Sequence, residues 1–403
     1  MEKKDILFLC QFFYPEYVSS ATLPYDTAKA LKEAGFFVDV MCGYPKEYVK
    51  NKSVPTEENI EGINIYRLKY LQFKRSNFLG RLINYCSFVI VVFLHLFKLK
   101  NYKTVIVYTN PPILPLFAVL AKKIFKIKVI LVAYDIYPEI MIKTGIVSEN
   151  SILSKIMKCI NGIVYPNLDK VITLSSDMKE FIKNNRNIIE NRVISIPNWY
   201  EEVKEEETIV KFTEKYKNKI IISYLGNLGT CQDLETILGA IRILKSNNNI
   251  TFVFAGHGNK MELLHKIVKE EKLKNVDILG FLQKKEYEAI LSISKFAIVS
   301  IASGLIGLCA PSKVYGYMMA GIPIIAIMDE LEIKEKIKEY NAGFVLKNGE
   351  SIKMVKFITE SINNKIKMNE MSINSKRLFL DNYTKNKCLQ KYVLFMKEFL
   401  KDI

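Results

Sequence analysis

The chain of 403 residues has few of the residue patterns that hold metal ions. It contains no Asp-x-Asp pair, only three histidines, and seven cysteines without a Cys-x-x-Cys spacing. An odd number of cysteines with no paired spacing argues against both a disulfide framework and a structural zinc site. Without a carboxylate pair there is also no usual carrier for a divalent ion. We therefore predict no metal ion, no cofactor and a reducing compartment.

Acidic residues are missing from one long stretch. Between Gly62 and Tyr134 there is no Asp or Glu, in a chain whose formal net charge is +16. The basic residues of this stretch are Arg67, Lys69, Lys74, Arg75, Arg81, Lys98, Lys100, Lys103, Lys122, Lys123, Lys126 and Lys128. An apolar run of about sixteen residues, 82–97, lies inside it and is shorter than the roughly twenty that span a bilayer.

That run predicts either of two structures. A helix lying in the membrane interface is typically apolar and flanked by cations, as here. A long core helix would show the same hydrophobicity, because periodicity alone does not separate the two. The acid-free surroundings favour the membrane surface. Nucleic acid is excluded as a partner, since no zinc-finger, RNP or helix-turn-helix pattern accompanies the basic residues.

Strand and helix signals alternate along the whole chain, which predicts parallel sheets. The expected strands lie at 5–10, 37–42, 104–108, 128–133, 170–174 and 193–196, then at 220–225, 251–255, 275–279, 296–300, 323–327 and 343–346. The length suits two domains, with the acidic run Glu201–Glu207 as linker and a last helix near 385–401. No secretory signal is recognisable at the start, so we expect a cytoplasmic location.

Two segments of the second half predict an anion site. In the first, Pro311 fits the first helical position, and the amides of Ser312 and Lys313 would then face a ligand together with the lysine cation. Gly321 would end this helix in the left-handed conformation. In the second, the strand 220–225 runs into a turn that contains Gly226 and Gly229, followed by a helix. Such turns are common, but two of them could bracket one ligand.

The order of these and other motifs resembles the family-4 glycosyltransferases. The shared motifs are Gly226-Asn-Leu-Gly, Phe254-Ala-Gly-His-Gly258, Gly280-Phe-Leu282, Pro311-Ser-Lys313, Ala320-Gly-Ile-Pro323, Gln11-Phe-Phe-Tyr-Pro-Glu16, Asp135-Ile-Tyr-Pro-Glu139 and Ile196-Pro-Asn-Trp199. The chain is most similar to bacterial enzymes of O-antigen, capsule and colanic-acid assembly.

The resemblance implies the GT-B fold, in which two Rossmann-like, parallel-sheet α/β domains face a cleft. Residues 1–200 would form the acceptor-side domain, completed by the helix 385–403, and 201–384 the donor domain. It implies a retaining enzyme that moves a hexosyl or N-acetylhexosaminyl group from a nucleotide sugar, with a UDP-sugar expected, to a lipid-linked saccharide at the inner face of the cell membrane. The expected donor-binding residues are Gly226, Asn227, Gly229, Gln232, Gly258, Leu282, Pro311, Ser312 and Lys313.

The chain departs from the family pattern at the donor contacts. Leu308 and Gly316 occupy the positions of two glutamates that contact the donor in the wider family, and Asn227 and Gln232 lie where a basic pair is usual. Lys313 is thus the expected source of charge for the diphosphate.

Catalysis needs a carboxylate or imidazole near the acceptor hydroxyl. Asp135 and Glu139 follow a predicted strand at its carboxyl end, where ligands of open α/β sheets bind, although Asp135 could equally cap a turn. Glu16 is the next candidate. The remaining expected acceptor-side residues, all near Glu16, are Tyr14, Ser19 and Ser20.

Two other functions fit the same fold. A UDP-sugar epimerase would need more histidines and acids than these motifs supply. A non-catalytic protein that binds sugar nucleotides or acts as a membrane adaptor is favoured by the loss of the two glutamates, because a fold does not by itself imply an activity.

Overall fold

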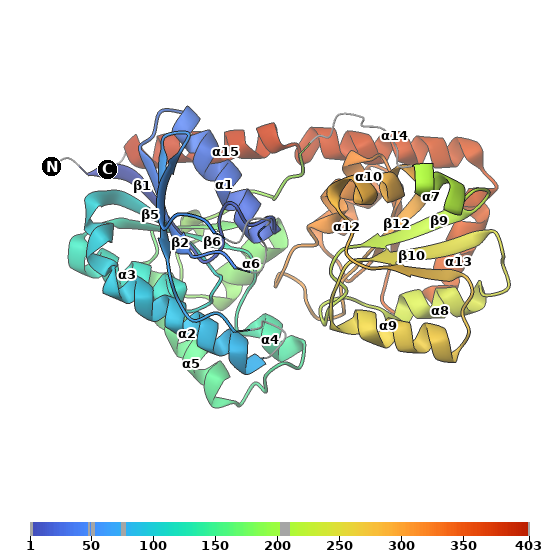
Figure 1. Cartoon of the computed structure of the whole chain (residues 1–403), viewed down its shortest axis with the longest axis horizontal. Coiled ribbons are helices and arrows are strands. Elements are labelled where there is room, and N and C mark those ends of the chain that lie inside the picture. The colour runs from blue at the N-terminus through green and yellow to red at the C-terminus, as the bar shows by residue number, and fades with distance from the viewer. Residues whose placement is uncertain (1–2, 47–48, 50–52, 74–77, 202–209, 402–403) are drawn as a thin grey trace. The chain divides into compact units, whose positions relative to one another are not determined.

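The computed structural model describes residues 3–46, 49, 53–73, 78–201 and 210–401 (Figure 1). Contacts divide the chain into two units. The N-terminal unit comprises Met1–Asn198, Gly307–Ala310 and Asn386–Ile403, and the C-terminal unit comprises Trp199–Ile306 and Pro311–Lys385. The predicted linker lies, apart from Glu201, outside the described residues.

The sheet of the N-terminal unit has eight strands in the order β3-β4-β2-β1-β5-β6-β7-β8. Their bounds are β1 Lys4–Cys10, β2 Val38–Gly43, β3 Glu57–Ile60, β4 Ile63–Leu68, β5 Tyr102–Tyr108, β6 Lys128–Ala133, β7 Lys170–Thr173 and β8 Val193–Ser195. Neighbouring strands are parallel except β3, which pairs antiparallel with β4. The prediction of a parallel sheet is confirmed, but the strands β3 and β4 were not predicted; β3 is a short polar edge strand that alternates between exposed and half-buried residues.

Helices cover both faces of this sheet. They are α1 Ser19–Glu33, α2 Phe78–Leu94, η1 Leu96–Asn101, α3 Leu114–Phe125, α4 Glu139–Lys143, α5 Ile152–Val164, η2 Tyr165–Asn167, α6 Ser176–Asn185, η3 Glu190–Arg192 and α15 Lys385–Lys401. In Figure 1, α2, α3 and α5 lie on one side of the sheet, and α1 lies on the other. This arrangement follows from right-handed crossovers, since the chain runs outward from β1 in both directions.

The C-terminal unit is built on a six-stranded, wholly parallel sheet in the order β11-β10-β9-β12-β13-β14. Its strands are β9 Ile220–Leu225, β10 Ile250–Ala255, β11 Val276–Leu279, β12 Ser294–Ser300, β13 Ile324–Ile327 and β14 Gly343–Leu346. Its helices are α7 Val210–Lys215, α8 Glu235–Ile243, α9 Asn259–Glu270, α10 Lys284–Ile293, α11 Lys313–Met319, α12 Glu332–Glu339, α13 Ser351–Ile362 and α14 Lys365–Asn382. All six strands match the prediction to within two residues.

A buried carboxylate joins four strands at the amino-terminal edge of the first sheet. Asp39 in β2 is almost fully buried and accepts hydrogen bonds from Lys4 Nζ of β1 at 2.6 Å and from Tyr102 Oη of β5 at 2.7 Å. Asn64 Nδ2 of β4 donates to the same carboxylate at 2.8 Å. Each partner thus compensates part of the desolvation of the Asp39 charge.

We therefore expect Asp39→Ala to lower the free energy of unfolding by about 3 kcal/mol, because it leaves the buried Tyr102 hydroxyl without its acceptor and removes the partner of Lys4 and Asn64. Urea denaturation followed by far-ultraviolet circular dichroism measures the change. Glu33→Ala, at an exposed carboxylate at the end of α1, is the control and should change stability by less than about 0.5 kcal/mol. Equal effects of the two substitutions would contradict a structural role for Asp39.

Candidate functional site

Three glycines let two loops of the C-terminal unit touch at the carboxyl ends of β9 and β10. Gly226, Gly256 and Gly258 have φ angles of +125°, +131° and +127°. A Cβ atom on Gly256 would lie 2.2 Å from the Gly226 oxygen, and one on Gly258 would lie 2.3 Å from the Leu228 oxygen. No larger residue fits at either position, so the two loops form one backbone surface.

Gln232 stabilises this backbone surface through hydrogen bonds of its side chain and its backbone. Its side-chain oxygen accepts a hydrogen bond from the Gly229 amide at 2.7 Å, and its backbone oxygen accepts one from Lys260 Nζ at 2.5 Å. Lys260, near the start of α9, is a cation beside the predicted donor loop and was not among the predicted site residues. Its position two residues after Gly258, the last residue of the motif Phe254-Ala-Gly-His-Gly258, is the sequence feature that could have identified it.

Lys313 reaches the same loop from α11. Its Nζ donates to the Tyr224 hydroxyl at 2.5 Å and to the Asn227 backbone oxygen at 2.8 Å, and lies 4.1 Å from the centre of the Tyr224 ring. Burial lowers the pKa of Lys313 to about 7. The expected permanent cation is therefore an amine that gains or loses its proton near neutral pH.

Tyr317, one turn further along α11, holds the end of β9. Its buried hydroxyl accepts from the Leu225 amide at 2.7 Å and donates to the Leu225 oxygen at 2.9 Å. These bonds satisfy backbone groups at the last residue of the strand, immediately before Gly226. Together, Lys313 and Tyr317 fix the β9 loop against α11.

The predicted start of this helix is wrong by two residues. The helix begins at Lys313, with Ser312 as the flanking residue and Pro311 outside it. The Pro311 and Ser312 oxygens accept from Val314 and Tyr315 amides in tighter turns than those of an α-helix. The expected end is confirmed, since Gly321 follows the helix with φ +67°.

The other expected donor positions are placed differently. Leu282 is half-buried in the loop between β11 and α10 and has no recorded hydrogen bond to the glycine loops. Leu308 is buried in the N-terminal unit, where its oxygen accepts from the Ile136 amide at 2.9 Å. A Cβ atom on Gly316 would lie 2.9 Å from the Tyr287 hydroxyl and 3.3 Å from the Tyr200 ring. Those tyrosines thus occupy space that a side chain at 316 would need.

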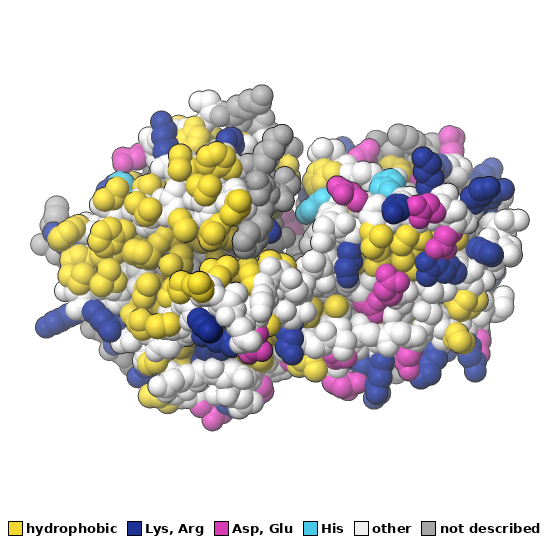
Figure 2. All heavy atoms as spheres, turned by 90° about the horizontal axis from the view of Figure 1, so that it is seen from below, with side chains coloured by type: hydrophobic (Ala, Val, Ile, Leu, Met, Phe, Trp, Pro, Cys, Tyr) yellow, Lys and Arg dark blue, Asp and Glu magenta, His cyan; other side chains and the backbone are white. Residues whose placement is uncertain are grey.

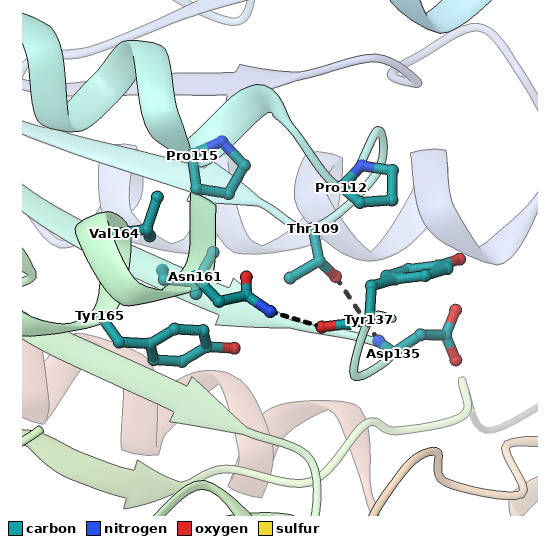
Figure 3. Close-up of a pocket in the computed structure, with 9 residues that line it drawn as sticks. Thr109, Pro112, Pro115, Asp135, Tyr137, Asn161, Val164 and Tyr165 are labelled. Atoms are coloured by element: carbon teal, nitrogen blue, oxygen red, sulfur yellow. Dashed lines mark hydrogen bonds between the residues drawn. The ribbon is translucent and has the colours of Figure 1, made fainter. Parts of the chain in front are cut away.

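A pocket in the N-terminal unit contains Asp135 (Figure 3). Thr109 Oγ1 accepts from the Tyr134 and Asp135 amides, and Asn161 Nδ2 donates to the Tyr137 oxygen at 2.7 Å. Burial raises the pKa of Asp135 to about 6, and a hydrogen bond from Tyr137 opposes this shift. In Figure 3 the Asp135 carboxylate and the Tyr137 ring both point away from Asn161.

Glu139, the first residue of α4, is engaged in an ion pair. Its Oε2 accepts from Arg186 Nη2 at 2.5 Å, and the same guanidinium group donates to the Tyr137 oxygen at 3.1 Å and lies over the Tyr165 ring. Because Tyr137 and Tyr165 both line the pocket, this pair shapes the pocket wall. Arg186 was missed in the sequence, where nothing connects it with a carboxylate 47 positions away.

Glu16 and its neighbours lie in a separate loop after β1. Glu16 is buried, Tyr14 is exposed, and Ser19 and Ser20 are the first two residues of α1. Arg67, whose side chain is fully buried, donates from Nη2 to the Tyr14 oxygen at 2.9 Å and so anchors this loop.

Among the described residues, no three His, Cys, Asp or Glu side chains lie together as a metal ion would need. The expectation of a metal-independent protein stays a prediction.

The bonds of Tyr317 to Leu225 lead to a stability prediction. Tyr317→Phe should lower the free energy of unfolding by about 1–3 kcal/mol, because the Leu225 amide is left buried without its acceptor. Tyr340→Phe is the control, since it removes a hydroxyl whose recorded bonds, to Asp381 and Asn382, are exposed or partly buried. Urea midpoints that fall equally in both variants would show that Tyr317 does not hold the strand end.

Comparison with known proteins places these sites in context. Residues 205–378 match the family described as Glycosyl transferases group 1. The chain is 25% identical over 301 residues to the probable glycosyltransferase WbjE of Pseudomonas aeruginosa, covering 73% of this chain and 74% of that protein. It is 25% identical over 163 residues to the putative colanic acid biosynthesis glycosyl transferase WcaI of Escherichia coli, covering 38% and 39%.

Solved structures show the same fold. Anabaena HepE in complex with UDP and glucose superposes with a TM-score of 0.73 at 14% identity, over 99% of this chain and 100% of that one. WaaG, a glycosyltransferase involved in lipopolysaccharide biosynthesis, superposes with a TM-score of 0.70 at 10% identity, over 97% and 99%. Residues 205–378 thus match a glycosyltransferase group 1 domain, and the chain has the GT-B fold of these solved structures, as its resemblance to family 4 implies.

Proposed function

We propose that the protein transfers a hexosyl or N-acetylhexosaminyl group from a UDP-sugar to a lipid-linked saccharide in surface-polysaccharide synthesis, with retention at the anomeric carbon. The observation that carries the proposal is the backbone surface of Gly226, Gly256 and Gly258 beside the Lys313 amine. Such a surface suits a diphosphate, which needs close backbone approach and a nearby cation.

Three relatives support the choice of substrates. HepE is described in complex with UDP and glucose, WcaI as a colanic acid biosynthesis transferase, and WaaG as involved in lipopolysaccharide biosynthesis. These descriptions support a uridine diphosphate donor and a place in surface-polysaccharide synthesis.

On the donor side, Lys313 would neutralise the departing diphosphate. A diphosphate near Nζ favours the protonated amine, because an opposite charge raises the pKa of a lysine. Lys260 supplies a second cation beside the same loop. Charge neutralisation by two lysines is consistent with transfer that requires no divalent ion.

On the acceptor side, we assign the carboxylate role to Asp135. In the proposed step, the bond from the anomeric carbon to the diphosphate oxygen breaks, and the acceptor hydroxyl oxygen bonds to that carbon on the face that the diphosphate leaves, so that the configuration is retained. The hydroxyl proton passes to a base, which we assign to Asp135, because its pKa of about 6 suits proton transfer near neutral pH. Glu139 is less suited, since Arg186 already holds its charge.

An enzyme that uses a lipid-linked acceptor has to act at a membrane surface. No helix among the described residues has both the length and the apolar character to cross a bilayer. The apolar run 82–97 forms α2 and the start of η1, and its inner side packs into the core while its outer side is exposed. We therefore propose peripheral association with the inner face of the cell membrane.

A second candidate function is a sugar-nucleotide-binding or adaptor protein without turnover. The observation that favours it is the crowding at Gly316, where a side chain would have to displace the Tyr287 hydroxyl, which lies 2.9 Å from the position of a Cβ atom. Incubation of the purified protein with UDP-sugars and membrane extract separates the two functions. Transfer of labelled sugar to lipid supports the enzyme, and binding of UDP without transfer supports the adaptor.

Lys313→Ala should lower UDP affinity about tenfold or more, because it removes the amine at the diphosphate. In the native protein, affinity should fall as pH rises from 6 to 8, since Lys313 loses its proton near pH 7. Isothermal titration calorimetry measures both. Lys274→Ala, at an exposed lysine of the same unit, is the control. An unchanged affinity and pH slope in Lys313→Ala would remove Lys313 from the donor site.

Asp135→Asn should reduce turnover by about 10²-fold or more while leaving UDP binding intact, because an amide cannot accept the proton. Turnover of the native protein should fall below about pH 6, where Asp135 becomes protonated. Sugar transfer to a soluble acceptor, measured across pH, provides the test. Turnover within a few-fold of the native value would mean that Asp135 is only a turn residue and would shift the assignment to Glu16.

A further inference from the structure

The outer side of α2 is an apolar stripe. Leu79, Ile83, Cys86, Ile90, Phe93 and Phe97 are all exposed and repeat at intervals of three or four residues into η1. That interval places them on one side of a helix. The opposite side, with Phe88, Val89 and Val92, is buried in the core. Core packing thus accounts for only half of the apolar character of this helix.

A second apolar stripe runs along α5. Ile152, Ile156, Cys159 and Ile163 are exposed and follow the same helical interval. Lys155 and Lys158 flank the stripe. The sequence analysis did not single out this helix, which lies outside the acid-free stretch that it identified.

The two stripes belong to one layer. The helix α3 packs against both α2 and α5 on the same side of the sheet (Figure 1). The view onto that side in Figure 2 shows hydrophobic side chains gathered across the N-terminal unit. We call the exposed side chains of α2, η1, α3 and α5 the apolar helix face. Soluble proteins rarely expose apolar area on this scale unless it binds a partner.

The charge of the apolar helix face is one-signed. The four helices contain no Asp or Glu, whereas they carry Arg81, Lys98, Lys100, Lys122, Lys123, Lys155 and Lys158. Some of these cations are paired with acids from elsewhere in the unit, such as Lys122 with Asp169 at 2.6 Å and Lys158 with Glu149 at 2.9 Å. Lys123, however, is exposed and has no recorded ion pair within the described part of the chain.

Two basic residues of the acid-free stretch lie close to acids of the same unit. Lys103 pairs with Asp5 at 2.9 Å, and Lys98 lies 3.9 Å from Glu57. Their charges are partly neutralised, so much of the free energy of binding to a membrane has to come from the apolar stripes. This shifts the expected attachment from an electrostatic one towards insertion of side chains.

We propose that the apolar helix face inserts into an anionic lipid bilayer, with α5 as a second inserted helix beside α2. The proposal deepens the proposed function, on which it rests for the membrane-bound acceptor. A bilayer fits both properties of the face, since acyl chains accept the isoleucines and anionic head groups attract the lysines.

A second copy of the chain fits less well. A symmetric pair would bring the same patch of each copy together. The uncompensated lysines would then face lysines, which disfavours association. A nucleic acid also fits less well, because aliphatic side chains form no hydrogen bonds with phosphates or base edges.

The test uses substitutions on α5 with a matched control. Ile152→Glu with Ile156→Glu places charges at residues that are 77% and 50% exposed. The control, Ile352→Glu with Ile243→Glu, makes the same changes in the C-terminal unit at residues that are 76% and 52% exposed. Sedimentation with vesicles of phosphatidylglycerol and phosphatidylethanolamine measures binding. We expect at least a tenfold loss of affinity for the α5 variant and native affinity for the control.

Salt distinguishes insertion from surface attraction. Native binding should weaken but persist at about 0.5 M salt, because apolar burial is not screened whereas the attraction between charges is. Binding that disappears in salt, or equal binding by the α5 variant and its control, would overturn the proposal. So would a native dimer in analytical ultracentrifugation that the α5 substitutions dissociate without any binding to vesicles.

The two exposed cysteines give a direct readout, since one lies in each stripe. In a background with Cys231→Ser and Cys309→Ser, a polarity-sensitive fluorophore is attached to Cys86 or Cys159 with the other replaced by Ser. Both probes should shift to the blue with vesicles, whereas a probe at Ile352→Cys should not. A shift at Cys86 alone would exclude α5 from the inserted surface.

These outcomes stay separate from the proposed function. UDP binding and transfer to a soluble acceptor should survive the α5 substitutions, because Ile152 and Ile156 belong to neither candidate site. If both persist but vesicles do not bind, the insertion proposal fails and the proposed function stands. If vesicles bind as expected but no sugar is transferred, the proposed function fails instead.

Discussion

Burial of both faces of a parallel sheet is the constraint on which both units depend. Because helices cover both faces of such a sheet, polar groups can lie only at the ends of its strands. In the N-terminal unit, Asp39 links four strands at the amino-terminal edge, while Asp135 follows β6 at the opposite edge. In the C-terminal unit, the glycine loops likewise follow the carboxyl ends of β9 and β10. In the N-terminal unit, the structural carboxylate Asp39 and the candidate carboxylate Asp135 thus lie at opposite ends of the strands.

The sequence predicts the central strands well because each is a short, continuous apolar run between turn residues. It fails for β3, whose residues are polar and partly exposed, and for β4, in which polar residues interrupt the apolar run. At the candidate sites, glycine spacing locates the loops, and the Gly226 turn and Lys313 do meet. The ion pair of Glu139 with Arg186 could not be predicted, because partners 47 positions apart are brought together only by the fold.

Lys313 shows why a motif does not by itself define a charge. The Pro-Ser-Lys pattern places a lysine at the start of α11, but burial against Tyr224 lowers the pKa of its amine to about 7. The hydrogen bonds to Tyr224 and Asn227 fix the position of Nζ rather than its protonation state. A dianionic ligand would restore the charge, since a nearby opposite charge favours the ammonium form. The basicity of this lysine is therefore a property of the complex and not of the sequence.

The hydropathy of the helix α2 likewise does not reveal which of its sides is buried. Its inner and outer stripes are both apolar, so its sequence is that of a helix buried on all sides. The fold supplies a core for one stripe only, because the helix lies at the outside of the layer formed with α3 and α5. The exposed stripe on α5 makes an accidental exposure of α2 a poor explanation, since two helices with no acidic residue present the same kind of surface. Partition into a bilayer interface removes both stripes from water without a second layer of protein.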